Sequence, residues 1–388
     1  MALVAGFLGC ASKEKTGMKI YVQQKLYDKA IAQGTLALKQ NPNDGDTHYF
    51  MGAAYYGKDS ELSTEVAFYA DSAAAWLGRA YNHFTQAKKL AEASWAASAD
   101  DNIVSMWGRH YNRGVIASKN GDHKTAAVEY GLATIADPEN HKGFYARASA
   151  DWELAKAAKK ANNDAEFQTL TATIVQDLDQ VLKLEPGDKE TQVNVYQTKG
   201  DVLYRRGDVQ GAQEAYKQAV ALSPEDYTLR TTVAERFYNE GNWENAAAYF
   251  QDALSIKERL NLITEKDKEL YTAVGNSYSK LERRPEAADA YEKALKLAPN
   301  DEANIYNLMV THYQSGSAAE KGGDMASAKQ SYLKAISLGD QLIGMNESQS
   351  SYWQVRGLCK RGVGDFAGAA RDLNKYRELE KAAGKGSQ

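Results

Sequence analysis

Small and aromatic residues return at constant intervals along most of this chain, within segments that are otherwise polar. Gly275 is followed twelve residues later by Ala287, and then by Tyr291, Ala294 and Pro299. The same order recurs twice more, with Gly200, Ala212, Tyr216, Ala219 and Pro224, and with Gly114, Ala126, Tyr130, Ala133 and Pro138. Apolar residues at intervals of three and four predict helices, so each stretch is expected to form a pair of them.

The residues between the paired helices predict tight turns. Gly-Asp occupies positions 121–122 and 207–208, and Gly-Asn occupies 241–242. Glycine and Asp or Asn favour such turns, and the prolines that close the three stretches cannot continue a helix. We expect the small residues twelve positions apart to let two backbones approach, and the aromatic residues to fill the space towards the neighbouring pair. One pair cannot bury its own apolar face, so the pairs should stack.

This order of residues resembles the tetratricopeptide repeat. Weaker copies carry Tyr21, Ala30, Gly34, Ala37 and Pro42; Ala234, Phe237, Ala246, Phe250 and Ala253; Ala328, Tyr332 and Ala335; and Gly357 with Ala369. The resemblance covers nearly the whole chain from about Lys13 to Lys381. It implies an all-α fold, a tetratricopeptide-repeat helical solenoid made of antiparallel helix pairs.

Three pairs break the twelve-residue spacing. The interval is 28 residues from Gly52 to Ala80, 26 from Ala148 to Ile174, and 19 from Met309 to Ala328. We expect extended helices or loops there, on one edge of the array. Residues 57–72 form the first insert, and residues 152–168 are predicted to be a solvated helix extension. Residues 93–106 form a further insert that would lengthen the first helix of the third pair.

A short apolar run, residues 2–9, ends at Cys10 and is followed at once by polar residues. The sequence around Cys10 resembles a bacterial lipobox, in which the cysteine is lipidated and the chain is cleaved just before it. The resemblance implies a signal segment over residues 1–9 and a membrane anchor at Cys10. The alternative is an ordinary cysteine in an N-terminus that is not a signal.

Composition excludes several classes of function. The net charge is −4 over 388 residues, with 25% charged residues, so nothing favours nucleic-acid binding. The mean hydropathy is −0.58, and no apolar run approaches the length of a membrane span. The chain has only two cysteines, Cys10 and Cys359, so it is not a disulfide scaffold.

Catalytic and metal-binding patterns are also missing from the sequence. The six histidines do not form a known metal-ligand spacing, and no cofactor or phosphate-binding motif occurs. His48 and His110 are expected to be packing or surface groups, and Cys359 a buried structural thiol. The carboxylates are dispersed, so no acid–base pair can be chosen. The sequence therefore predicts no enzyme activity, no cofactor and no metal.

A partner is expected to bind along the first helices of the pairs, as the family resemblance implies. Helical phase turns a set of polar and tyrosine side chains towards this surface: Tyr204, Arg205, Tyr238, Asn276, Lys280, Tyr306 and Tyr313. Asn276 and Asn307 match the Asn positions of a carboxylate-binding clamp known in the family, but the basic residues of that clamp are missing. The regular stretch from Gln192 to Tyr313 is the expected site, rather than the first half with its inserts.

These observations predict an adaptor or scaffold without catalytic activity. We expect a lipid-anchored protein on the periplasmic side of a bacterial outer membrane, with a protein or peptide partner that assembles an envelope complex. The alternatives are a cytoplasmic adaptor or co-chaperone, and an envelope protein that binds glycan or peptidoglycan. The expected parts are a signal at 1–9, repeats with inserts at 10–186, repeats at 187–382 and a flexible tail at 383–388.

Overall fold

All regular structure is helical in the computed structural model, which describes residues 13–62 and 69–385. The α-helices of these residues are α1 (Lys13–Gln23), α2 (Tyr27–Gln40), α3 (Gly45–Glu61), α4 (Tyr69–Leu90), α5 (Ala93–Lys119), α6 (His123–Ala136), α7 (His141–Lys160), α8 (Asp164–Leu184), α9 (Lys189–Arg206), α10 (Val209–Leu222), α11 (Tyr227–Asn239), α12 (Trp243–Arg259), α13 (Lys268–Lys280), α14 (Arg284–Leu297), α15 (Glu302–Lys321), α16 (Met325–Met345), α17 (Ser350–Gly362) and α18 (Phe366–Lys385). A short 3₁₀ turn, η1 (Glu265–Asp267), precedes α13. The predicted all-α tetratricopeptide solenoid is confirmed.

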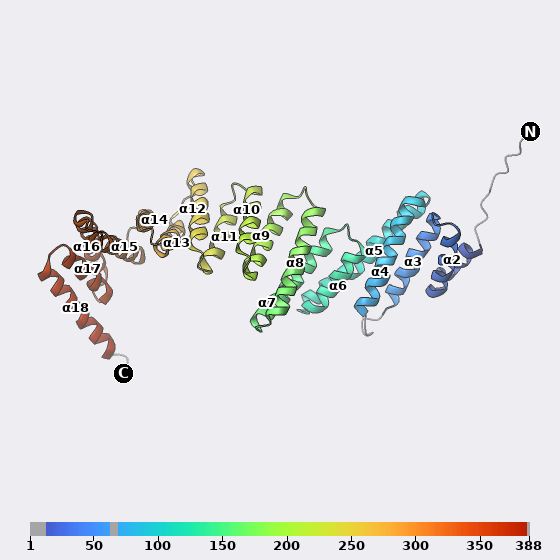
Figure 1. Cartoon of the computed structure of the whole chain (residues 1–388), viewed down its shortest axis with the longest axis horizontal. Helices are drawn as coiled ribbons and strands as arrows, with labels where there is room; N and C mark the ends of the chain where they lie inside the picture. Colours follow the sequence, from blue (N-terminus) through green and yellow to red (C-terminus); the bar gives the residue numbers. More distant parts are fainter. Residues whose placement is uncertain (1–12, 63–68, 386–388) are drawn as a thin grey trace, which may run out of the picture. The chain divides into compact units, whose positions relative to one another are not determined.

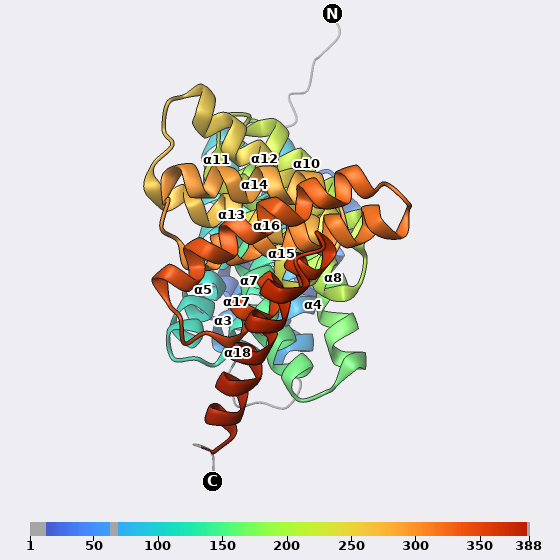
Figure 2. The same ribbon diagram turned by 90° about the vertical axis from the view of Figure 1, so that its left-hand side faces the viewer.

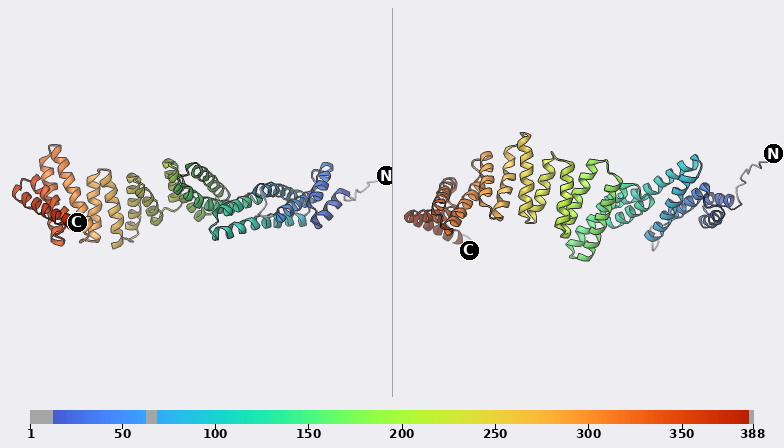
Figure 3. Two further views of the ribbon diagram at one scale, coloured as in Figure 1. Left: turned by 90° about the horizontal axis from the view of Figure 1, so that it is seen from below. Right: turned by 45° about the horizontal axis from the view of Figure 1, so that its top comes forward.

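The helices fall into two compact units, which we describe separately. The N-terminal unit is Met1–Leu222 and the C-terminal unit is Ser223–Gln388. In both units consecutive helices pack as antiparallel pairs, which Figure 1 shows in chain order and Figure 3 from two further directions. The predicted division at residues 186 and 187 lies in the turn between α8 and α9, and it stays a prediction.

The predicted turns between paired helices are confirmed. Gly121, Gly207 and Gly241 have φ values of 77°, 92° and 76°, a left-handed conformation that glycine adopts without steric cost. The next residue then caps the second helix. The Asp122 side chain accepts a hydrogen bond from the Thr125 amide, as N-caps do.

A glycine on the first helix of four of the described pairs is covered by a ring sixteen residues later. A Cβ at Gly275 would lie 2.6 Å from the Tyr291 ring, and one at Gly200 would lie 2.4 Å from the Tyr216 ring. The same relation joins Gly114 to Tyr130 and Gly316 to Tyr332. The expectation that the aromatics face the neighbouring pair holds for Tyr332, because a Cβ at Gly362 on α17 would lie 2.4 Å from its ring. Each ring also lies on its own pair, because the missing side chain leaves it a flat surface.

The C-terminal unit repeats with a period of 41 residues. The small residue of the first helix recurs at Ala234, Gly275, Gly316 and Gly357, and the second helices begin at Trp243, Arg284, Met325 and Phe366. Both series advance by 41 residues, seven more than the 34 of a tetratricopeptide repeat. Seven residues make nearly two helical turns, so the added length keeps each face in phase.

The added residues lie at different places in successive repeats. α13 begins seven residues before Gly275, whereas α15 begins fourteen residues before Gly316. α16 is lengthened at its other end, and this end packs on the start of α15: a Cβ at Gly339 would lie 2.9 Å from Cε of Met309. Figure 2 shows α15 and α16 as two long orange helices. The extensions thus form one longer helix pair with its own apolar contacts.

This register corrects one predicted insert. The interval of 19 residues from Met309 to Ala328 does not separate the paired small residues, because the small residue that receives Tyr332 is Gly316. The expected extension lies at the start of α15 and at the end of α16. Gly316 and Ala328 are twelve residues apart, as in the regular pairs. The N-terminal unit does contain the longer helices that were expected: α5 has 27 residues, and α7 and α8 have 20 and 21.

The predicted solvated extension at 152–168 is only partly solvated. α7 continues to Lys160 and α8 begins at Asp164. Near these two helix ends, Ala155, Ala158 and Phe167 are buried and belong to one apolar cluster. The extension therefore has a small core of its own.

Candidate functional site

The side chains predicted to line a partner site belong to both compact units. Tyr204 and Arg205 lie at the end of α9 in the N-terminal unit, where the Arg205 guanidinium is 5.8 Å from the centre of the Trp152 ring. The other five predicted residues lie in the C-terminal unit on its first helices, α11, α13 and α15. That unit therefore holds the predicted residues that can belong to one contiguous site.

Two of the residues predicted to line the site, Tyr238 and Asn276, are brought together on adjacent first helices. The Asn276 amide donates to the Tyr238 hydroxyl at 3.1 Å, and the Tyr291 hydroxyl donates to the Asn276 carbonyl oxygen at 2.8 Å. The Tyr238 ring also makes an edge contact with Trp243, with ring centres 5.2 Å apart. Asn276 thus joins two repeats through both ends of its amide, and Tyr238 is held in one orientation.

A polar cleft lies between α13 and α15. Its volume is about 550 Å³, and its lining residues are Ser279, Glu282, Arg284, Tyr313, Gln314, Ser317, Ala318 and Lys321. Arg284 is half-buried there: its Nη2 is 3.4 Å from a Glu282 oxygen, and its Nε is buried without a hydrogen-bond partner in the described chain. Such a cleft offers donors, a tyrosine and positive charge to a polar segment of a partner.

Two predicted residues, Tyr306 and Lys280, are not among the side chains that line the cleft. Tyr306 lies on the seven-residue extension of α15, and its ring centre is 5.5 Å from that of Tyr352 on α17. It does not line the cleft, whereas Tyr313 does. In the 41-residue register Asn307 no longer matches an Asn position of the carboxylate-binding clamp, because the residue equivalent to Asn276 is Ser317. Lys280 is exposed near the end of α13.

The first helices of the N-terminal unit also form a small cleft, which the sequence did not indicate. Its volume is about 170 Å³, and its lining comes from α5, α7 and α9: Tyr111, His141, Lys142, Tyr145, Ala146, Thr191 and Asn194. The Tyr111 ring stacks on Trp107, with ring centres 4.6 Å apart. His141 is fixed by Glu185, 2.9 Å away.

His110 is buried and joins three helices of the N-terminal unit. Its Nδ1 is 2.7 Å from a Glu129 oxygen, and its Nε2 is 3.2 Å from Asp59. Burial favours the neutral ring, but the hydrogen bonds and charges of the two carboxylates outweigh it, so the pKa of His110 is raised. The Tyr69 hydroxyl donates to the other Glu129 oxygen at 2.9 Å. His110 was expected to be a packing or surface group, and it is a buried member of an ionic network.

Cys359 is fully buried, as expected of a structural thiol, and burial raises its pKa to about 12. Across residues 13–62 and 69–385, no cluster of three or more His, Cys, Asp or Glu side chains is arranged to hold a metal. Among those same residues no helix is both long and apolar enough to cross a bilayer. Cys10, the predicted lipidation site, lies outside the described residues.

The sequence missed most of the cleft between α13 and α15. Ser317, Arg284 and Lys321 were not singled out, although each sits at a fixed distance from Gly275 or Gly316. The signal that would have found them is the 41-residue period, because it aligns the first helices of successive repeats.

Three models of the tetratricopeptide-repeat family match the chain, at residues 198–259, 268–301 and 311–338. A TPR repeat-containing protein of Methanocaldococcus jannaschii is 23% identical over 307 residues, which are 77% of this chain and 49% of that protein. A human protein O-mannosyl-transferase is 26% identical over 180 residues, 46% of this chain and 18% of that protein. The chain thus spans half or less of the length of these relatives.

Two solved structures are also similar. The crystal structure of MamA matches 50% of this chain and 96% of its own, with 19% identity and a TM-score of 0.38. That of YrrB, titled a TPR protein with an unusual peptide-binding site, matches 53% of this chain and 92% of its own, with 14% identity and a TM-score of 0.37.

Proposed function

This chain is a tetratricopeptide-repeat protein, and on that basis we propose that it is a non-catalytic adaptor that binds an extended peptide or a helix of a partner protein. The partner lies along the first helices of the C-terminal unit. The observation that carries this proposal is the polar cleft of about 550 Å³ between α13 and α15, lined by Tyr313 and Arg284.

Two side chains on the first helices α11 and α13 also suit recognition because they are already ordered. Tyr238 and Asn276 are fixed by hydrogen bonds across two repeats, so little conformational entropy is lost when a partner binds them. Arg284 and Lys321 supply positive charge at the cleft, which favours a polar or acidic segment. A rigid tyrosine such as Tyr313 adds a large contact area at low entropic cost.

Site-specific photo-crosslinking tests this location. A photoreactive phenylalanine in place of Tyr313 should give discrete adducts with a partner in the native host. The same residue in place of Glu292, which is exposed on α14 and does not line the cleft, should not. Adducts of equal yield and identity at both positions would remove the cleft as the partner site.

We propose further that the protein is anchored to a bacterial envelope membrane by lipid on Cys10, with its repeats in the periplasm. The support is the sequence alone, a short apolar run that ends at Cys10. Cys10→Ser should move the protein from the membrane to the soluble fraction. Two or three acyl chains hold a protein stably at a membrane, and the variant would carry no acyl chain. Unchanged membrane association of the variant would mean that Cys10 does not carry the anchor, whereas an unsubstituted protein found in the soluble fraction would favour the cytoplasmic alternative.

A further inference from the structure

A second pocket in the C-terminal unit lies on the other side of the helix pairs from the first-helix cleft. It is formed by the second helices α12 and α14, with α13 beneath them, and its volume is about 460 Å³. We propose that this pocket binds an arginine side chain of a basic segment in a partner protein. The proposal does not depend on the cleft between α13 and α15, and the partner need not be the same.

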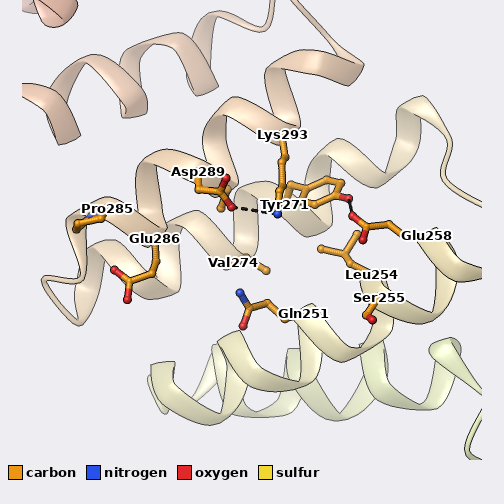
Figure 4. A pocket seen from close by; sticks show the side chains of 11 residues that line it. Gln251, Leu254, Ser255, Glu258, Tyr271, Val274, Pro285, Glu286, Asp289 and Lys293 are labelled. Atoms are coloured by element: carbon orange, nitrogen blue, oxygen red, sulfur yellow. Dashed lines mark hydrogen bonds and ion pairs between the residues drawn. The ribbon is translucent and has the colours of Figure 1, made fainter.

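The floor of the pocket is apolar, so it can hold a methylene chain. Leu254, Val274 and Ala290 line it and are only 2–3% exposed. Figure 4 shows Leu254 and Val274 between the carboxylates of Glu258 and Glu286, which stand at opposite ends. An arginine or lysine stem can bury its carbons on such a floor while its charged head reaches the rim.

The rim is acidic. Glu258, Glu286 and Asp289 line the pocket, and Lys293 is the one basic residue among its lining side chains. Lys293 is paired with Asp289 at 3.0 Å, and Glu286 is paired with Arg283 at 2.9 Å. These pairs neutralise two of the three carboxylates and leave Glu258 as the acidic group that is not compensated.

Glu258 is fixed in place by a neutral donor. The Tyr271 hydroxyl donates to its Oε1 at 2.5 Å, and within the described chain no cation lies at ion-pair distance from it. Tyr271 is itself buried, so the carboxylate is held at the pocket mouth by a rigid ring. A carboxylate that is oriented but unpaired binds a cation with little reorganisation.

Arginine fits this pocket better than other cations. Its planar guanidinium can bond both oxygens of a carboxylate and is more weakly hydrated than an ammonium. It can also stack on an aromatic ring, which the Tyr271 ring at the pocket wall offers. The combination of an apolar floor, an unpaired carboxylate and a tyrosine therefore favours a guanidinium head on a flexible stem.

The test uses the full chain and a defined probe. The probe is the acetylated and amidated pentapeptide Ser-Gly-Arg-Gly-Ser, and its control carries citrulline, which has the same shape without the charge. Methyl NMR signals of Leu254, Val274 and Ala290 report binding in the pocket. We expect the arginine peptide to shift these signals, and the citrulline peptide to bind at least about fivefold more weakly.

Matched variants locate the charge. Glu258→Gln should weaken the arginine peptide about fivefold or more, whereas Glu292→Gln, which removes an exposed charge from α14 outside the pocket, should change affinity less than about twofold. Tyr271→Phe keeps the ring but frees Glu258, and should give an intermediate loss. Tyr313→Ala, in the other cleft, should leave peptide binding unchanged.

Three results would overturn the proposal. The first is no shift with the arginine peptide, and the second is equal binding of the citrulline peptide or of the Glu258→Gln variant. The third is a shift of the same methyl signals with protein concentration alone, which would make a second copy of this chain the occupant.

Discussion

The ring of Tyr291 lies where the side chain of Gly275 would be, and a Cβ at residue 275 would come within 2.6 Å of it. The ring is almost fully buried, and its hydroxyl donates to Asn276, the next residue after the glycine. One short segment of α13 therefore both receives the ring and fixes its hydroxyl, so the two helices of this pair are locked in register.

Substitution of Gly275 should be far more harmful than substitution of a nearby exposed residue. Gly275→Leu should destabilise the C-terminal unit by about 2 kcal/mol or more, because the ring of Tyr291 must leave its position. Lys280→Leu, on the same helix but exposed, should change stability by less than about 0.5 kcal/mol. Ala287→Leu should resemble the glycine variant, since Ala287 is fully buried. Thermal melts compare the three, and equal melts would refute the assigned register.

The turn at Glu282 offers a stabilising substitution. Glu282 has φ 58°, whereas the equivalent turns use Gly241, Gly323 and Gly364. A left-handed conformation costs a non-glycine residue about 1–2 kcal/mol, part of which glycine loses again as chain entropy. Glu282→Gly should therefore raise stability by about 0.5–1 kcal/mol. Gly323→Ala is the reverse control and should lower it. A lower melting temperature for Glu282→Gly would mean that its contact with Arg284 outweighs the strain.

The N-terminal unit should lose stability in acid through His83. The His83 ring is half-buried, and its Nδ1 lies 2.9 Å from Nδ1 of His48. Burial first, and then the charge on His48, lower the pKa of His83 to about 4 from the ordinary 6.5. A lowered pKa means that the folded state favours the neutral ring, so this stability is present above pH 6.5 and is lost as the pH falls towards 4. In the His83→Phe variant, the urea concentration at the unfolding midpoint should depend less on pH between about pH 6.5 and 4. An unchanged acid slope would exclude His83 as its source.

His110 should act in the opposite direction. Its pKa is raised by the hydrogen bonds and charges of Asp59 and Glu129, which outweigh burial. The stability from its charged form is therefore present below pH 6.5 and declines as the pH rises through the higher folded value. At pH 6, His110→Gln should cost about 2 kcal/mol, because two buried carboxylates lose their closest charged partner and keep only Arg109 and Arg113, at 3.5 and 4.0 Å. The loss of stability in this variant should be smaller at pH 9 than at pH 6, and urea titrations at the two pH values would measure the difference. A cost independent of pH would mean that only packing is lost.

Sequence patterns were sufficient to predict the helix pairs, because the small residues, turn residues and prolines determine the structure of residues close to them in the chain. The position of Gly316 was missed for a physical reason. Met309 and Gly316 are seven residues apart on one helix, so both face the same side and either can be aligned with Gly275. Only the contact with the Tyr332 ring distinguishes them.

The sites depend on tertiary contacts that no local pattern announces. His110 meets Asp59 and Glu129 from two other helices, 51 and 19 residues away in the chain. Glu258 is oriented by Tyr271, which follows it across the long connection before α13. Tyr238 and Asn276 are hydrogen-bonded neighbours, since both keep a fixed phase relative to the small residue of their helices, and their part in partner binding stays a prediction.

The 41-residue period also has a consequence for how such a chain can change. A step of seven residues lengthens a helix by about 10 Å while turning its side chains by only about 20°. The length of a helix and the direction of its side chains can therefore change independently. A gain or loss of seven residues alters how far the helix extends and leaves its buried and exposed residues on the same faces as before. The extensions of α15 and α16 lie against each other, so steps of this kind can be added in matched pairs, each supplying the apolar surface that covers the other.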